Sequence, residues 1–426
     1  MVRFITLLVG LVIGWHNVAV EVSGPVARVE VRLDGRVVGA RNTAPWIVRC
    51  DLGREPRPGE LTAVAYDADG QEIGRDSQRI NVPGDVADAT ILPERDESGR
   101  VVSARVTWQS PAFDEPKKLI ATVGDERVRV DSSGRVDLRG FEPGQLHVLD
   151  VELRFADDVV LHRGLVFGTG FSGETESRLS AVPVTLDRVG ELPDDLDGWF
   201  EVDDEPVTVV AAERGDAVLV VVRESAAEAR LLDLERYAAN RRGRDPDRLS
   251  SDTLMRMLVP EPILPTPRDG SVLFPISDRS IPGEDGLFRL LTHPNHGPVL
   301  GDVPRVAEGV ATAALDAARG NRRRAVLLVL DGRERADASR FSTRAVREYL
   351  RQLRVPLVIW SLSGAAVDPS WGEATPIGGL DDFKKATLRL RALLDSQRMV
   401  WLTGHHLPNR IQLGEHARGI SLAGAE

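Results

Sequence analysis

Few side chains in this sequence have the type and spacing that chemistry requires. Ser225 follows an apolar run and has the type of a nucleophile, but it lacks the flanking glycines of the sharp turn that exposes such a serine. His293 and His296 have a spacing found in pairs of metal ligands, although Pro and Asn between them indicate a loop and a third ligand is not apparent. Acidic pairs are too numerous to nominate one as catalytic. We therefore expect a protein that is not an enzyme, with a hydrolase using Ser225 or His293 and His296 as the alternative.

The region that holds Ser225 predicts an α/β arrangement. At 322–332, RRRAVLLVLDG is a continuous apolar run between arginines and an Asp-Gly turn, which is typical of a strand buried on both faces. Apolar residues at three- and four-residue steps predict helices over 303–319 and 343–353. A second apolar run, VPLVIWSL, predicts a strand at 355–362. Helix, strand, helix and strand in this order predict a parallel sheet with crossover helices.

The first part of the chain has a different pattern. Apolar and polar residues alternate from 18 to 82, with Gly, Pro, Asp and Asn at intervals, and a second alternating block follows. This predicts two antiparallel β-sandwiches, at 1–84 and 88–170. The segments RVEVRLDG, TAPW and PGELTAVAYDADG in the first block resemble bacterial immunoglobulin-like repeats. The resemblance implies an immunoglobulin-like sandwich at the start of the chain.

The C-terminal half resembles a von Willebrand factor type A domain. The strings DAVLVVVRES at 216–225, AVLLVLDG at 325–332 and VPLVIWSLSG at 355–364 look like its first, fourth and fifth strands. The resemblance implies a doubly wound, Rossmann-type α/β domain at 216–426, preceded by a β-hairpin lead-in at 181–215. It places an inner strand at 271–277 and the last strand at about 399–403. The prolines of PEPILPTP at 260–267 are incompatible with regular structure and predict a surface excursion.

In an active A domain the first strand is followed by Asp-x-Ser-x-Ser, a later loop supplies Thr, and the fourth strand ends in Asp. These oxygen ligands suit Mg²⁺. Here Arg223 stands where the leading Asp is expected, Ser225 keeps the first Ser, and Ala227 replaces the second. The loop before the helix at 303–319 contains no Thr, and only Asp331 stands in its family position. The resemblance therefore implies a degenerate metal-ion-dependent adhesion site (MIDAS), with no metal and no cofactor.

The first and fourth strands of such a sheet are neighbours, so Arg223 and Asp331 should emerge side by side at its carboxyl edge. A guanidinium repels a divalent ion and pairs well with a carboxylate, so we predict a salt bridge between them. Glu224 is the alternative: with Asp331 it could ligate a cation and support cation-dependent adhesion. Asp337 and Ser339 lie too far beyond the strand to complete the motif, but they belong to the polar loop at 333–342 that we expect to border the site.

Composition narrows the classes of partner. The 426 residues carry a net charge of -11 without a basic face, which argues against a nucleic-acid partner. The single cysteine, Cys50, excludes an internal disulfide and a multi-cysteine metal site. Residues 1–17 have a basic start and an apolar stretch, which fit either a signal peptide or the first strand of the sandwich. Apart from that segment, we expect no membrane span.

The sequence thus predicts a modular, exported protein of the periplasm or cell surface, with a cytoplasmic protein as the alternative. We expect it to act in protein binding, adhesion or assembly, at the carboxyl edge of the C-terminal sheet. The candidate residues are Arg223, Glu224, Ser225, Asp331, Asp337 and Ser339.

Overall fold

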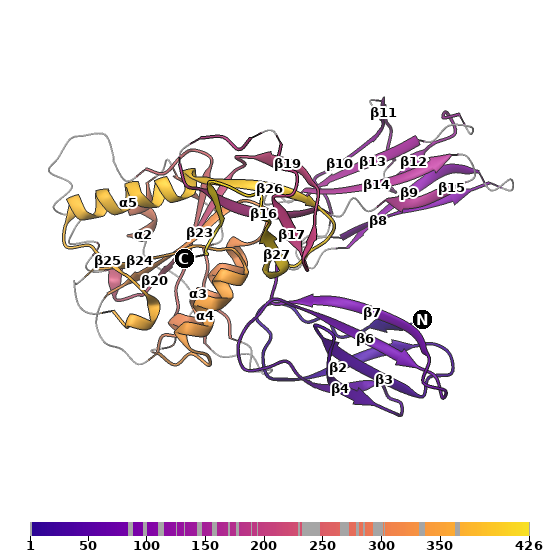
Figure 1. Cartoon of the computed structure of the whole chain (residues 1–426), viewed down its shortest axis with the longest axis horizontal. Helices are drawn as coiled ribbons and strands as arrows, with labels where there is room; N and C mark the ends of the chain where they lie inside the picture. The colour runs from indigo at the N-terminus through magenta and orange to yellow at the C-terminus, as the bar shows by residue number, and fades with distance from the viewer. Residues whose placement is uncertain are drawn as a thin grey trace. The chain divides into compact units, whose positions relative to one another are not determined.

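The structure is a computed structural model of the chain (Figure 1). It describes residues 2–83, 88–96, 100–109, 115–124, 126–131, 133–142, 147–155, 160–168, 171–175, 179–188, 190–193, 195–228, 231, 248–264, 272–277, 281–283, 286–292, 301, 303–331, 337–362 and 367–425. The chain divides into two compact units. One comprises 1–84, 180–402 and 406–426, and the other comprises 85–179 with 403–405.

The first unit begins with a β-sandwich of two antiparallel sheets, ordered β1-β2-β5 and β4-β3-β6-β7. Alternate residues of its strands point inward and form one core that includes Val18, Val31 and Leu61. Its strands are β1 (Val2–Phe4), β2 (Trp15–Val22), β3 (Arg28–Leu33), β4 (Arg36–Arg41), β5 (Ile47–Asp51), β6 (Gly59–Tyr66) and β7 (Glu72–Ile80).

Gly39 lets the two sheets approach each other closely between β4 and β5. A Cβ atom at this position would lie 2.6 Å from the carbonyl oxygen of Arg49 and 2.7 Å from a methyl carbon of Val48. Distances this short require the backbone to move, so only glycine fits here.

The end of β1 and the segment after it are attached by side chains to the edge strand β7 and to Asn81, which follows β7. Phe4 N donates to Asp76 Oδ2 at 2.8 Å, Leu8 N donates to Gln78 Oε1 at 3.1 Å, and Val12 N donates to Asn81 Oδ1 at 2.6 Å. The bonds from Leu8 and Val12 satisfy backbone N–H groups of the irregular segment between β1 and β2. Of the ambiguous start of the chain, 2–4 and 15–22 are therefore strands of the sandwich.

The second unit is also a β-sandwich, with sheets ordered β11-β10-β13-β14-β15 and β12-β9-β8. Its core includes Ala104, Leu149, Val151 and Leu165. The strands are β8 (Asp88–Arg95), β9 (Val101–Gln109), β10 (Lys118–Val123), β11 (Glu126–Val128), β12 (Arg135–Asp137), β13 (His147–Arg154), β14 (Val160–Gly168) and β15 (Phe171–Thr175).

A six-stranded sheet ordered β22-β21-β20-β23-β24-β25 forms the centre of the remaining chain. Neighbouring strands from β21 to β25 are parallel, and the edge strand β22 is antiparallel. The strands are β20 (Ala217–Arg223), β21 (Thr253–Leu258), β22 (Ile281–Pro282), β23 (Arg323–Leu330), β24 (Leu357–Ser361) and β25 (Thr375–Pro376). All residues of β20 and β23 are buried, as continuous apolar runs predict.

Helices cover both faces of this sheet, and alternate strand residues serve the two cores. Val220 and Leu328 lie in one core with α3 (Val306–Ala317) and α4 (Thr343–Gln352), whereas Leu219 and Leu327 lie in the other with α2 (Leu287–Leu291) and α5 (Leu380–Asp395). Residues of a strand point alternately to opposite faces, so each buried strand supplies both cores.

Two arginines at the start of β23 hold the ends of the surrounding helices. Arg323 Nη1 donates to Leu394 O at 2.7 Å, and Arg324 donates to Ala318 O at 3.0 Å and Leu353 O at 3.3 Å. These oxygens belong to the last turns of α5, α3 and α4. The last carbonyl groups of a helix have no following turn whose N–H groups could bind them, so the arginines take that place. Burial lowers the pKa of Arg324 to about 10.

The structure corrects two of the predicted strands. The strand beside β20 is β21 (Thr253–Leu258), not the segment at 271–277, of which 272–277 runs beside the end of β21 with a single bridge between Leu258 and Ile276. The predicted last strand, β26 (Gln397–Thr403), does not join the parallel sheet but pairs in the antiparallel sheet β19-β26-β16-β28. Both segments are short apolar runs, and such runs do not by themselves reveal their neighbours.

The segment predicted as a hairpin lead-in, 181–215, is combined with the C-terminal residues in two small sheets. Besides β19-β26-β16-β28 there is β18-β17-β27. Their remaining strands are β16 (Leu179–Leu186), β17 (Phe200–Val202), β18 (Glu205–Pro206), β19 (Val209–Glu213), β27 (Ile411–Leu413) and β28 (Ile420–Leu422). Among the described residues, no helix has the length and apolar character needed to cross a membrane.

Candidate functional site

The candidate site lies where β20 and β23 end. The strands are parallel with Arg223 opposite Val329, so Glu224, Ser225 and Asp331 follow at the same edge of the sheet. In the order β22-β21-β20-β23-β24-β25, the strands that follow β20 in sequence lie on one side of the β20–β23 pair, and the strands that follow β23 lie on the other side. Crevices beside such a reversal point are where open α/β sheets bind ligands.

Arg223 is fully buried, and its guanidinium is held by groups other than the predicted one. Nη2 donates to Glu228 Oε2 at 2.9 Å, and Nη1 donates to Leu291 O at the end of α2. The predicted salt bridge with Asp331 is not among the ion pairs of the described residues. Arg223 shares the sheet face of Leu219 and Val221, which α2 covers, and this face directs its side chain to the end of α2. Burial lowers the pKa of Arg223, and the carboxylates of Glu228 and Glu261 oppose that shift.

Glu224 connects the ends of the two strands. Its side-chain Oε2 accepts a hydrogen bond from Asp331 N at 2.7 Å, and its own N–H donates to Val329 O at 3.2 Å. Glu224 is 6% exposed and Asp331 is 1% exposed. The carboxylate that we considered as a substitute metal ligand is therefore bound to the backbone of the residue with which it would share the ion.

Ser225 has a partner that the sequence did not indicate. Its Oγ donates to Glu261 Oε2 at 3.0 Å, and its N–H approaches Glu261 Oε1 at 3.4 Å. Glu261 is 5% exposed, so the start of the segment predicted as a surface excursion is buried at the carboxyl end of β21. Because we expected an inner strand at 271–277 and a surface excursion at 260–267, Glu261 was not among the candidate residues.

A serine bonded only to a carboxylate lacks the imidazole that activates a nucleophile in the common triads. The described part of the chain brings no imidazole to Ser225 among its recorded hydrogen bonds. His293 and His296, the other residues of the hydrolase alternative, lie outside the described residues.

Asp337 and Ser339 support the start of helix α3. Asp337 Oδ1 accepts from Val306 N at 3.0 Å and Oδ2 accepts from Ala307 N at 3.2 Å, while Ser339 Oγ accepts from Glu308 N at 3.2 Å. The first N–H groups of a helix have no partner within it, so these side chains act as a cap supplied from another segment. Of the loop predicted at 333–342, residues 333–336 lie outside the described residues.

Beside this cap is a pocket of about 310 Å³. Its floor includes the buried Phe341, and hydroxyl groups and charges surround it. Two of the predicted residues, Asp337 and Ser339, therefore have a structural role and also border a hollow at the carboxyl edge. The pocket is lined by Asp337, Ser339, Phe341, Ser342, Thr343, Arg344, Asp368 and Ser370.

The structure thus places the candidates in two groups. Arg223, Glu224, Ser225 and Asp331 share the ends of β20 and β23, and Asp337 with Ser339 lies beside α3 and the pocket. Within the described ranges, no group of three or more His, Cys, Asp or Glu side chains has a geometry that could hold a metal ion. The sequence missed Glu228, Glu261 and the carbonyl of Leu291.

No family model matches the sequence, and no curated protein matches it. Solved structures that resemble parts of the chain include the fibronectin(III)-like modules of Clostridium thermocellum CbhA, with 17% identity over 39% of this chain and 94% of that one, and a TM-score of 0.17.

Two further structures resemble parts of it. Proximal thread matrix protein 1 of the mussel byssus, with a zinc-occupied MIDAS motif, has 12% identity and a TM-score of 0.28, and the match covers 43% of this chain and 49% of that one. The central fibronectin-III array of RIM-binding protein has 14% identity and a TM-score of 0.22, over 47% of this chain and 82% of that one. The chain is thus coarsely similar to fibronectin III-like modules and to a protein with a MIDAS motif.

Proposed function

We propose that this chain is a non-enzymatic binding protein, of adhesion or assembly type, whose von Willebrand A-like domain recognises a protein partner without a divalent ion. The observation that carries the proposal is the buried guanidinium of Arg223 at the end of β20, held by Glu228 and Leu291 O. A fixed positive charge at this position opposes a divalent cation by Coulomb repulsion. The sheet order supports the A-like assignment, since numbering the strands from β20 gives the doubly wound order 3-2-1-4-5-6.

Two further contacts support binding without metal. Glu224 Oε2 accepts from Asp331 N and Ser225 Oγ donates to Glu261, so the protein itself already fixes both side chains at the strand ends without an ion. The pocket beside Asp337 and Ser339 offers hydroxyl groups and charges of both signs to a partner. Recognition there would use direct hydrogen bonds and apolar contact with Phe341.

Thermal unfolding in the presence of cations tests the metal-independent site. A metal that binds only the folded state at about 100 times its Kd adds about 2.7 kcal/mol to the free energy of unfolding. We expect Mg²⁺, Mn²⁺ and Ca²⁺ to leave the melting temperature within the change produced by NaCl of equal ionic strength, and EDTA to have no effect. A saturable rise that disappears in Asp331→Asn would refute the proposal in favour of cation-dependent adhesion through Glu224 and Asp331.

Capture from an extract of the source cells tests the binding surface. We expect the intact chain to retain the same partner in Mg²⁺ and in EDTA, and Arg344→Glu, which reverses an exposed charge of the pocket, to retain less of it. Loss of capture in EDTA would contradict metal-independent binding. Labelling of Ser225 by a serine-reactive probe in the folded protein, absent from Ser225→Ala, would support the hydrolase alternative.

A further inference from the structure

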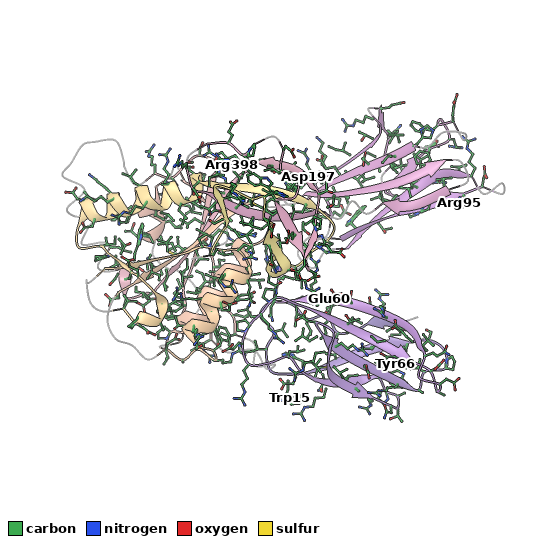
Figure 2. All side chains as sticks on the ribbon, in the orientation of Figure 1. Trp15, Glu60, Tyr66, Arg95, Asp197 and Arg398 are labelled. Carbon is green, nitrogen blue, oxygen red and sulfur yellow. The ribbon has the colours of Figure 1, made fainter. Side chains whose placement is uncertain are left out.

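The outer face of the sheet β1-β2-β5 in the N-terminal sandwich carries three large apolar side chains that are exposed. Ile5 is 63% exposed, Trp15 is 60% exposed and Ile47 is 43% exposed. Figure 2 shows Trp15 on the outside of this sandwich. Side chains alternate between the two faces of a strand, and this alternation defines the outer face. It consists of Arg3, Ile5, Trp15, Asn17, Ala19, Glu21, Ile47, Arg49 and Asp51.

The apolar side chains form a row across the sheet. Ile5 N donates to Ala19 O at 2.9 Å, which places Ile5 beside Ala19, and Ala19 is the register partner of Ile47 on β5. The row thus runs from Ile5 through Ala19 to Ile47. Ala19 is small, so the middle of the row leaves room for an opposing surface to approach to the usual separation of two packed sheets.

Charged residues on both sides of the row balance each other. Arg3 is paired in register with Glu21 on one side, and Arg49 lies two residues from Asp51 on the other. The face carries two positive and two negative side chains, on a chain whose net charge is -11. It therefore offers no net attraction to an anionic or a cationic surface, while an identical face meets it without net repulsion.

We propose that this outer face docks a second copy of the chain in an isologous dimer. A two-fold axis lying in the face along the row places Ile5, Ala19 and Ile47 of one copy against the same residues of the other. Glu21 and Asn17 lie two residues from Ala19 in opposite directions along β2, about 7 Å each. The rotation therefore brings Glu21 of one copy over Asn17 of the other.

The same rotation creates two ion pairs. Asn17 is the register partner of Arg49, one strand away, so Glu21 of one copy is offset sideways by about 5 Å from Arg49 of the other copy, and the two long side chains meet in the space between sheets about 10 Å apart. Symmetry repeats the pair. The guanidinium of Arg49 lies 4.6 Å from the ring centroid of Trp15, and this cation–π contact holds it against the face before a partner arrives.

The size of the face indicates a weak, exchanging dimer. Three strands about 4.8 Å apart and about seven residues long span roughly 14 Å by 24 Å, or about 340 Å² per copy, which is less than half of the roughly 800 Å² per partner in a standard specific interface. We therefore expect the weight-average mass to rise from monomer toward dimer between about 10 µM and about 1 mM of the intact chain. Sedimentation equilibrium at moderate salt measures this rise.

Charge exchange identifies the face. Glu21→Arg alone brings two arginines together in each pair, and Arg49→Glu alone brings two glutamates together, so each variant should dimerise at least about tenfold more weakly. Mixed in equal amounts, the two variants should form a heterodimer as readily as the wild type, because both pairs again join opposite charges. Circular dichroism establishes that each variant is folded.

A matched control separates this face from general stickiness. Ile5→Asp should abolish dimerisation, whereas Leu388→Asp, at a residue of α5 that is 56% exposed, should not change it. A wild-type chain that remains monomeric over the whole range would overturn the proposal. Dimerisation that is unaffected by Ile5→Asp, or single charge variants that do not rescue each other, would also overturn it.

Discussion

The ion pair below the candidate site gives the sharpest prediction, because the two ways of breaking it have different costs. Replacing Glu228 by Leu leaves the guanidinium of Arg223, which is 0% exposed, without this carboxylate. Removing one partner of a buried pair costs about 3–5 kcal/mol. The side chain of Glu228 is 27% exposed, so water can reach part of the site. We therefore expect Glu228→Leu to lower the free energy of unfolding by about 2–4 kcal/mol.

Replacing Arg223 by Met should cost less. Methionine keeps the length of the apolar stem, and Glu228, once unpaired, can turn its carboxylate to water. The variant loses the hydrogen bond to Leu291 O, and a buried acceptor left without a donor costs about 1–3 kcal/mol. This cost is offset because the variant no longer has to bury a charged guanidinium away from water. We expect Arg223→Met to lower stability by about 0–2 kcal/mol.

The double variant completes the cycle. In Arg223→Met with Glu228→Leu no buried charge of the pair remains, so its stability should lie near that of Arg223→Met alone. The coupling energy should then equal the cost of Glu228→Leu, about 2–4 kcal/mol. Urea unfolding followed by tryptophan fluorescence gives the values, and Arg351→Met, at an exposed pair with Glu348, serves as the control with an effect below about 1 kcal/mol.

Two results would refute this reasoning. If Glu228→Leu costs less than about 0.5 kcal/mol, the carboxylate does not stabilise the guanidinium. If Arg223→Met costs more than about 4 kcal/mol, the charge itself is required for the fold, and the site cannot be described as a substituted metal position with a local ion pair.

Three further predictions concern single side chains. Asp337→Ala removes the cap from Val306 N and Ala307 N and should lower stability by about 1–2 kcal/mol in urea unfolding, while Asp69→Ala at an exposed turn should change it little. Burial raises the pKa of the Tyr349 phenol, so just above pH 10 only the unfolded state deprotonates. The stability that the neutral phenol supplies below that pH is therefore lost as the pH rises. The free energy of unfolding of the wild type should fall by about 1.4 kcal/mol per pH unit relative to Tyr349→Phe. Burial raises the pKa of the Cys50 thiol to about 12, so a thiol reagent at pH 8 should react with the protein only after unfolding.

Each of these has a plain contrary outcome. Equal stabilities of the two aspartate variants would show that the bonds from Asp337 do not stabilise α3. Parallel stability curves of wild type and Tyr349→Phe between pH 9 and about pH 11 would show that Tyr349 titrates normally in the folded state. Rapid labelling of Cys50 in the native protein would contradict its burial.

The sequence alone determined the elements with the strongest local patterns. The run at 325–330 is apolar throughout and ends at Asp331, which is typical of a strand buried on both faces, and it lies in β23. The alternating stretches before residue 82 likewise became the strands of a sandwich. Both patterns are local, because the order of apolar and polar residues along a strand predicts which of its faces are buried.

Only the tertiary structure decided which groups meet at the end of the sheet. The sequence placed Arg223 and Asp331 at one edge but paired them with each other, whereas Arg223 contacts Glu228 and Leu291 O, and Asp331 N contacts Glu224. Glu261 was missed because the strand before it was assigned to the wrong segment. Asp337, a candidate for its chemistry, caps a helix 31 residues earlier in the chain.

The reason is physical. Burial and periodicity depend on the order of neighbouring residues, so they can be read directly from the chain. The partner of a buried charge depends on which helix covers its face of the sheet and how far that helix extends, and these are set by packing among residues distant in sequence. For Arg223 that packing placed the last carbonyl of α2 within hydrogen-bonding reach, which no spacing in the sequence records.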